Sequence, residues 1–144
     1  MARIPDPQPG LVIRYANLWQ RDATQGRDEG TKYRPGVVVL AAEPDDDYGK
    51  IVLVAPITHR KPDVPATGVE IPPLTKRRLG LDSERSWVIV TEVNRFEWPG
   101  PDLLPVAPGQ WAYGVLPAGL FRTIRDRLAH SARQRNIAQV GHEP

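Results

Sequence analysis

The sequence predicts a mainly β protein, a small antiparallel barrel or curled sheet with one α-helix near the C-terminus. Three observations predict this fold class. Short apolar runs alternate with turn residues, a spacing typical of small barrels. Prolines, of which the 144 residues contain 16, stand at the ends of those runs, where a missing backbone N–H does least harm. The four-residue apolar repeat of a helix follows residue 117.

The first half of the chain contains three predicted strands. Gly10 opens an apolar run at 11–16, and the polar stretch at 17–32 is long for a loop in a compact domain. Loops of that length are usually functional or mobile. Val-rich residues 36–42 form the second strand, and residues 50–58 form the third after a turn of aspartates.

The second half begins with a short strand at 67–71, which two prolines end. A basic connector at 75–85 has room for one helical turn. Residues 86–93 form another strand, which 94–98 continue past a bend, and residues 99–114 are predicted to be an irregular loop.

A C-terminal helix is predicted from Pro117, which suits a first helical turn, to about Ala132. Leu120, Ile124 and Leu128 recur every fourth residue and form one apolar stripe. We expect this stripe to pack against the core.

Residues 1–144 are expected to form a single domain, because the length suffices for one core and the sequence has neither a repeat nor a linker. The proline-rich residues 1–9 are expected to be a disordered or draped arm. Residues 133–144 are expected to be a frayed or disordered tail.

The composition limits the classes of site. There is no cysteine, which excludes disulfides and thiolate metal sites and suits the reducing cytoplasm, where we expect the protein to act. No segment approaches the roughly 20 apolar residues of a membrane span, so no membrane association is expected. The net charge is +2, but basic residues cluster at 76–78 and at 122–135. Such patches suit nucleic acid, and they equally suit solvated faces.

The sequence lacks common motifs for nucleotide binding, zinc binding and nucleophilic serine catalysis. There is no Walker loop, dinucleotide glycine fingerprint, HExxH motif or nucleophile elbow. His59, His130 and His142 lie far apart, so a multi-histidine metal site is not expected. We expect neither a cofactor nor a metal.

Two strand ends carry residues that suit phosphate chemistry. Arg34 precedes Pro35, which pushes it into extended geometry where a loop enters the second strand. Thr58 closes the third strand. If these strands are neighbours, an arginine and a hydroxyl share one cleft.

That pair suits metal-free RNA cleavage, in which the substrate's own 2′-hydroxyl attacks the phosphate. The enzyme then supplies a proton acceptor, a proton donor and a cation for the developing charge. Arginine binds phosphate with two parallel donors, and a threonine hydroxyl can hold the substrate in place.

An ordered set of short segments, within a match that runs from about Gly10 to Phe96, includes both strand ends. The segments are Pro9–Ile13, Glu29–Val39, Val54–Thr58, Gly80–Leu81 and Ser86–Val88. Together they resemble the PemK/MazF toxins of type II toxin–antitoxin systems.

The resemblance implies a CcdB-like, SH3-like antiparallel β-barrel with a C-terminal α-helix that forms homodimers. It implies a metal-independent endoribonuclease acting on single-stranded RNA, and an acidic antitoxin that occupies the RNA groove. Arg34 matches the family arginine before proline, and Thr58 matches the hydroxyl residue at the strand end. Glu29 matches an acidic residue five places before that arginine.

Five further residues are candidate RNA contacts: Lys32, His59, Lys76, Arg77 and Arg78. His59 borders the expected cleft and suits proton transfer, or is an ordinary surface histidine. The basic triplet contacts the phosphate backbone or forms a solvated turn.

Structural interpretations compete with the functional ones. Arg34 could pair with Glu29 across the loop, and Thr58 could satisfy a backbone group. Where many family members have an acidic residue followed by Gln, this chain has Thr91-Glu92, and Ile89 replaces a polar residue. We interpret Glu92 as an exposed strand residue or a dimer contact.

Two function classes remain. One is the ribonuclease toxin. The other is a binding module on the same fold, either inactive toward RNA or gripping a protein such as DNA gyrase, as CcdB relatives do. The Arg34 and Thr58 pair favours the enzyme, and residues 140–144 lack the aromatic, apolar C-terminus of CcdB-type proteins.

Overall fold

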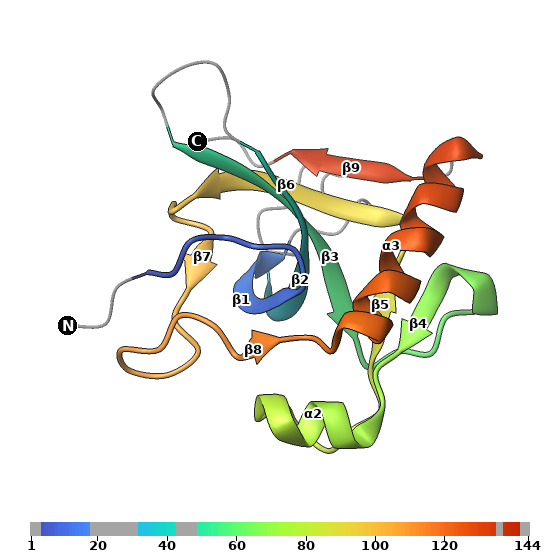
Figure 1. The fold of residues 1–144 in the computed structure, drawn as a ribbon, viewed down its shortest axis with the longest axis horizontal. Coiled ribbons are helices and arrows are strands. Elements are labelled where there is room, and N and C mark those ends of the chain that lie inside the picture. Colours follow the sequence, from blue (N-terminus) through green and yellow to red (C-terminus); the bar gives the residue numbers. More distant parts are fainter. Residues whose placement is uncertain (1–3, 18–31, 43–48, 135–136, 142–144) are drawn as a thin grey trace.

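The computed structural model describes residues 4–17, 32–42, 49–134 and 137–141 (Figure 1). The described elements, in chain order, are β1 (Leu11–Asn17), β2 (Lys32–Ala42), β3 (Lys50–Thr58), the 3₁₀ turn η2 (Pro65–Thr67), β4 (Gly68–Glu70), α2 (Pro73–Leu79), β5 (Trp87–Ile89), β6 (Glu92–Trp98), β7 (Leu103–Leu104), β8 (Gly114–Val115), α3 (Ala118–Arg133) and β9 (Ala138–Gly141). No helix among these residues is long and apolar enough to cross a membrane.

The strands form one twisted sheet centred on β3. Its order is β4-β5-β3-β2-β1-β7, with β6 also pairing with β3, β8 with β1 and β9 with β6. The pairs are antiparallel except for β6 with β9. The prediction of a mainly antiparallel β fold with a C-terminal helix is therefore confirmed, although the sheet curls without closing into a barrel.

Both faces of the sheet are covered, which explains why its central strands are continuously apolar. On β1, Leu11, Ile13 and Tyr15 enter one core cluster, whereas Val12 enters the other. The Tyr15 ring stacks on Phe96 at 5.5 Å between centroids. This alternation follows the two-residue period of a strand.

Helix α3 covers the face that contains Val12 (Figure 1). Ile124 and Leu128 are buried, and Leu120 packs against the same cluster from a less buried position. The predicted helix and its apolar stripe are confirmed.

The predicted strand at 86–93 is interrupted by a bend at Val90 and Thr91. Before the bend, β5 pairs with the last two residues of β3. After it, β6 pairs with the first half of β3, from Lys50 to Val54. The break therefore moves the chain from one end of β3 to the other.

Both terminal segments contact the sheet. Pro7 is buried, and the Trp98 indole Nε1–H donates to the Pro5 carbonyl at 2.9 Å. At the other end, Ala138–Gly141 pair in parallel with Glu92–Arg95 and bury Val140. The expectation of a frayed tail is wrong for these four residues, because they pair with a strand that is distant in the sequence. Such pairing cannot be predicted from the local sequence pattern.

Two other connecting segments are more ordered than predicted. Within the expected loop at 99–114, β7 pairs with β1 at Arg14 and Tyr15. The seven-residue helix α2 begins two residues before the basic connector at 75–85 and ends at Leu79, where Gly80 caps it with φ 72°. The predicted long loop at 17–32 and the aspartate turn lie mainly outside the described residues.

Gly36 allows β1, β2 and β3 to approach closely. A Cβ at this position would lie 2.5 Å from Tyr15 Cε1 and 2.6 Å from Val54 Cγ1. We expect Gly36→Ala to lower the free energy of unfolding by about 1–3 kcal/mol, the usual cost of overpacking a core. Urea denaturation would measure it, with Gly119→Ala on α3 as the control, since a Cβ there meets nothing within 4 Å. Equal stability of Gly36→Ala and the parent would contradict the close approach.

Candidate functional site

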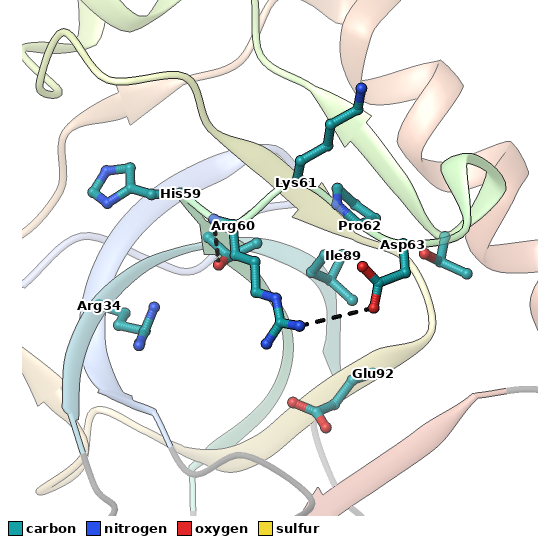
Figure 2. Close-up of a pocket in the computed structure, with 10 residues that line it drawn as sticks. Arg34, His59, Arg60, Lys61, Pro62, Asp63, Ile89 and Glu92 are labelled. Atoms are coloured by element: carbon teal, nitrogen blue, oxygen red, sulfur yellow. Dashed lines mark hydrogen bonds and ion pairs between the residues drawn. The ribbon is translucent and has the colours of Figure 1, made fainter.

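A cleft with a volume of about 720 Å³ contains two of the residues predicted for the site, Arg34 and Thr58. It lies where β3 ends and the chain bends between β5 and β6 (Figure 2). Its lining residues are Arg34, Thr58, His59, Arg60, Lys61, Pro62, Asp63, Thr67, Ile89 and Glu92.

Strand pairing brings Arg34 and Thr58 to the same cleft. β2 and β3 are antiparallel neighbours, and Gly36 is the partner of Pro56 in their register. Two residues further along each strand, in opposite directions, are Arg34 and Thr58. The sequence-based expectation that an arginine and a hydroxyl share one cleft is met, while their chemical roles stay predictions.

Glu92 is the residue that sequence reasoning missed. It is 7% exposed and lines the cleft, and Figure 2 shows its carboxylate turned toward the cleft. The interpretation of Glu92 as an exposed strand residue is wrong, because the bend at 90–91 turns it inward. An acidic residue inside a Val-rich run was the available signal.

The charges of Glu92 and Arg34 both reach Tyr15, the β1 partner of Arg34. Complete burial raises the pKa of the Tyr15 phenol well above its usual value, the Glu92 charge raises that pKa further, and the Arg34 charge opposes the rise. The Arg34 Nε and Glu92 Oε2 atoms are shielded from solvent. The charged groups of Arg34 and Glu92 thus lie partly out of contact with solvent, where water screens their electrostatic interactions less.

The Thr58 hydroxyl is mostly buried and has one defined bond. Its Oγ1 accepts a hydrogen bond from the Arg60 backbone N–H at 3.1 Å. Thr58 therefore does satisfy a backbone group, as the structural interpretation proposed. Because the oxygen acts as acceptor in this bond, its own O–H can still donate to a ligand.

His59 lies at the rim, and its ring turns away from Glu92 (Figure 2). Its Nε2 is 2.7 Å from Asp82 Oδ2, and its Nδ1 is 3.2 Å from Glu84 Oε2. These three exposed side chains bring potential ligand atoms within 4.8 Å of one another. Asp82 is also bonded to Lys76, so the cluster already contains a cation.

Lys76 is a structural residue. It is 4% exposed, and its ammonium donates to Asp82 Oδ1 at 2.5 Å, to Ser86 Oγ at 2.6 Å and to the Glu84 carbonyl. Both predictions for Lys76, an RNA contact or part of a solvated turn, are wrong because α2 turns this residue inward. Its bonds fix the loop at 82–86.

The other predicted RNA contacts are spread over the molecule. Arg77 and Arg78 are exposed on α2 and do not line the Arg34 cleft. Lys32 opens β2, two residues before Arg34, and only its backbone is described. Glu29 lies outside the described residues. The structure therefore brings together Arg34, Thr58 and His59 from the predicted set, and adds Glu92.

Asp82 makes stability depend on acid pH. Partial burial raises the pKa of its carboxyl, but the Lys76 hydrogen bond and the Lys76 and His59 charges outweigh this and lower the pKa below its usual value of 3.8. A lowered folded-state pKa stabilises the fold above pH 3.8, and this contribution disappears as the pH falls through the folded-state pKa. We expect Asp82→Asn to lower the free energy of unfolding at pH 7, and to lower it much less at a pH near the folded-state pKa of Asp82. Urea denaturation of the parent and of Asp82→Asn at these two pH values would measure the difference in their free energies of unfolding. If that difference is the same at both pH values, Asp82 is not the source of the pH dependence.

Comparison with known proteins gives a match in fold. No protein-family model and no curated protein sequence matches the chain significantly. A chain of the crystal structure of MazE-MazF (Form-III) from Deinococcus radiodurans matches with a TM-score of 0.55 and 19% identity, covering 91% of this chain and 98% of that one. The Form-II crystal structure gives 0.52 and 19%, with 90% and 96% covered. The chain therefore has a MazF-like fold, mainly antiparallel β with a C-terminal helix.

Proposed function

We propose that the chain is the toxin of a toxin–antitoxin pair and acts as an endoribonuclease on single-stranded RNA. The observation that carries the proposal is the cleft in which Arg34, Thr58 and the buried Glu92 meet. The MazF-like fold supports the same class of function.

The proposed reaction uses the substrate's 2′-hydroxyl as nucleophile. Its oxygen attacks the adjacent phosphorus, the bond to the 5′-oxygen breaks, and a 2′,3′-cyclic phosphate and a 5′-hydroxyl result. The enzyme has to accept the 2′-hydroxyl proton and stabilise the extra negative charge on the phosphoryl oxygens, and the departing 5′-oxygen takes up a proton from water or from the protonated base.

Each cleft residue has a role in this proposal. Glu92 accepts the proton, since it is the buried carboxylate among the described lining residues. Arg34 binds the phosphoryl oxygens with its guanidinium and stabilises their developing charge. The Thr58 hydroxyl, whose oxygen is anchored by the Arg60 N–H, donates to a phosphoryl oxygen and orients it.

We also propose a homodimer and an acidic antitoxin, both acting in the cytoplasm. Tyr33 and Leu40 on β2 are 63% and 51% exposed, and such apolar exposure on a strand suits contact with a second copy. An acidic segment could place carboxylates where RNA phosphates bind Arg34. The matching chains come from structures described as MazE-MazF.

Incubation of the purified chain with an end-labelled single-stranded RNA of mixed sequence tests the function. We expect discrete fragments that end in a 2′,3′-cyclic phosphate, with cleavage unaffected by EDTA. Loss of cleavage in EDTA would point instead to a metal-dependent site, for which His59, Asp82 and Glu84 are the candidates. If pure protein cuts no RNA, the binding-module alternative replaces the enzyme.

A further inference from the structure

The residues that follow Thr58 carry a second arginine into the cleft. Arg60 donates its backbone N–H to Thr58 Oγ1 at 3.1 Å, so its main chain is held next to the proposed substrate-binding hydroxyl. Its side chain extends across the cleft toward Asp63 (Figure 2). The loop therefore fixes the start of this side chain and leaves the guanidinium over the cleft.

The ion pair that Arg60 makes with Asp63 is weak. Arg60 Nη2 lies 3.8 Å from Asp63 Oδ2, and the two side chains are 81% and 88% exposed. Ion pairs this open to solvent contribute little to stability. The guanidinium can therefore leave Asp63 at small cost when a stronger anion arrives.

Lys61, the next residue, is directed differently. Figure 2 shows its side chain extending away from Arg34 and Glu92. Its charge acts on Glu70 of β4, whose pKa is lowered chiefly by the Arg85 hydrogen bond and slightly by Lys61. The two adjacent cations of this loop thus act on different anions. Of the two side chains, only that of Arg60 extends across the cleft (Figure 2).

We propose that Arg60 is a second phosphate-binding residue of this cleft, and that Asp63 holds it while no phosphate is bound. The ligand is a phosphodiester of single-stranded RNA, so the inference rests on the proposed function and extends it. A phosphate displaces the Asp63 carboxylate, because the guanidinium then gains paired, charge-assisted hydrogen bonds. Arg34 stabilises the reacting phosphate from the sheet, whereas Arg60 binds the strand from the loop.

Because Arg34 and Arg60 have different roles in this proposal, substitutions of the two residues should affect different kinetic constants. An exposed side chain that binds the strand before and during reaction contributes equally to both states, so its loss raises KM with kcat nearly unchanged. We expect Arg60→Gln to raise KM roughly tenfold, the effect of losing one hydrogen bond to a charged group. The plot of the logarithm of the RNA association constant against the logarithm of the salt concentration has a negative slope. In Arg60→Gln this slope should be less steep by about 0.7, the value for one phosphate contact on a single strand.

Lys61→Gln is the matched control. It removes the same charge from the same loop, so a general electrostatic effect would appear in both variants. Lys61 also borders the cleft, but its side chain extends away from Arg34 and Glu92 (Figure 2). We therefore expect Lys61→Gln to raise KM by no more than about twofold, clearly less than Arg60→Gln does. Binding would be measured by fluorescence anisotropy of a 2′-O-methyl RNA, which cannot provide the attacking hydroxyl, over a range of salt concentrations.

Asp63 gives an independent test of the hold on Arg60. Asp63→Asn should tighten RNA binding by up to roughly fivefold, the range for releasing one exposed ion pair. In the Arg60→Gln background the same change should have a smaller effect. An equal effect in both backgrounds would mean that Asp63 acts only by repelling RNA, and that it holds no arginine.

The outcomes separate this inference from the proposed function. If the parent chain binds and cuts RNA but Arg60→Gln and Lys61→Gln behave alike, the role of Arg60 is wrong and the function stands. A fall in kcat at unchanged KM would also overturn it. If the parent neither binds nor cuts RNA, the proposed function fails and the inference fails with it. Circular dichroism of each variant would verify the fold.

Discussion

Arg34→Ala is expected to lower the rate of RNA cleavage by about 10²–10³, the usual loss when one preorganised donor to a developing charge is removed. The effect should appear in kcat, because the negative charge on the phosphate increases in the transition state. The measurement is single-turnover cleavage of an end-labelled RNA, with EDTA present throughout.

Two further variants make the Arg34 result specific. Arg95→Ala on β6 removes an exposed arginine that does not line the cleft, and it should cut at the parent rate. Arg34→Lys keeps the charge but loses the planar fork, so it should recover only part of the activity. Circular dichroism would show whether the fold survives. Parent-like cleavage by folded Arg34→Ala would remove this residue from the mechanism.

Glu92→Gln is expected to lower the cleavage rate by about 10²–10⁴, the range for general base catalysis. The substitution keeps the size of the side chain and removes the proton acceptor. Since Glu92 is 7% exposed, water has little access to replace the carboxylate. Single-turnover rates measured as for Arg34 would give the ratio.

Glu97→Gln on the same strand is the control for Glu92. Glu97 is exposed and does not line the cleft, so its variant should cut at the parent rate. A faster Glu92→Gln variant would be as informative as a slow one. It would mean that the carboxylate restrains Arg34 and takes no proton.

The sequence predicted those features that depend on neighbouring residues. Proline before a Val-rich run located the start of β2, and the four-residue repeat located α3 and its buried face. The meeting of Arg34 and Thr58 followed because consecutive short strands usually pair. Local chemistry and simple topology were sufficient for this half of the site.

The features that the sequence did not predict depend on distant contacts. Glu92 is buried because β5 and β6 pair with opposite ends of β3, which no local pattern encodes. Lys76 was grouped with Arg77 and Arg78 by charge, although helical geometry sends consecutive residues to different faces. Its burial required the acceptors of the 82–86 loop, which become neighbours only in the folded chain.

The tripeptide Arg34-Pro35-Gly36 separates two kinds of evolutionary constraint. Pro35 and Gly36 are constrained by the backbone, because the one favours an extended Arg34 and the other leaves room for Tyr15 and Val54. An insertion or deletion here would send Arg34 to the other face of β2, since side chains alternate along a strand. The arginine side chain itself lies in the cleft and is only half-buried. A substitution at position 34 thus removes an arginine of the proposed RNA site while the architecture persists, whereas a substitution at position 36 affects the architecture first.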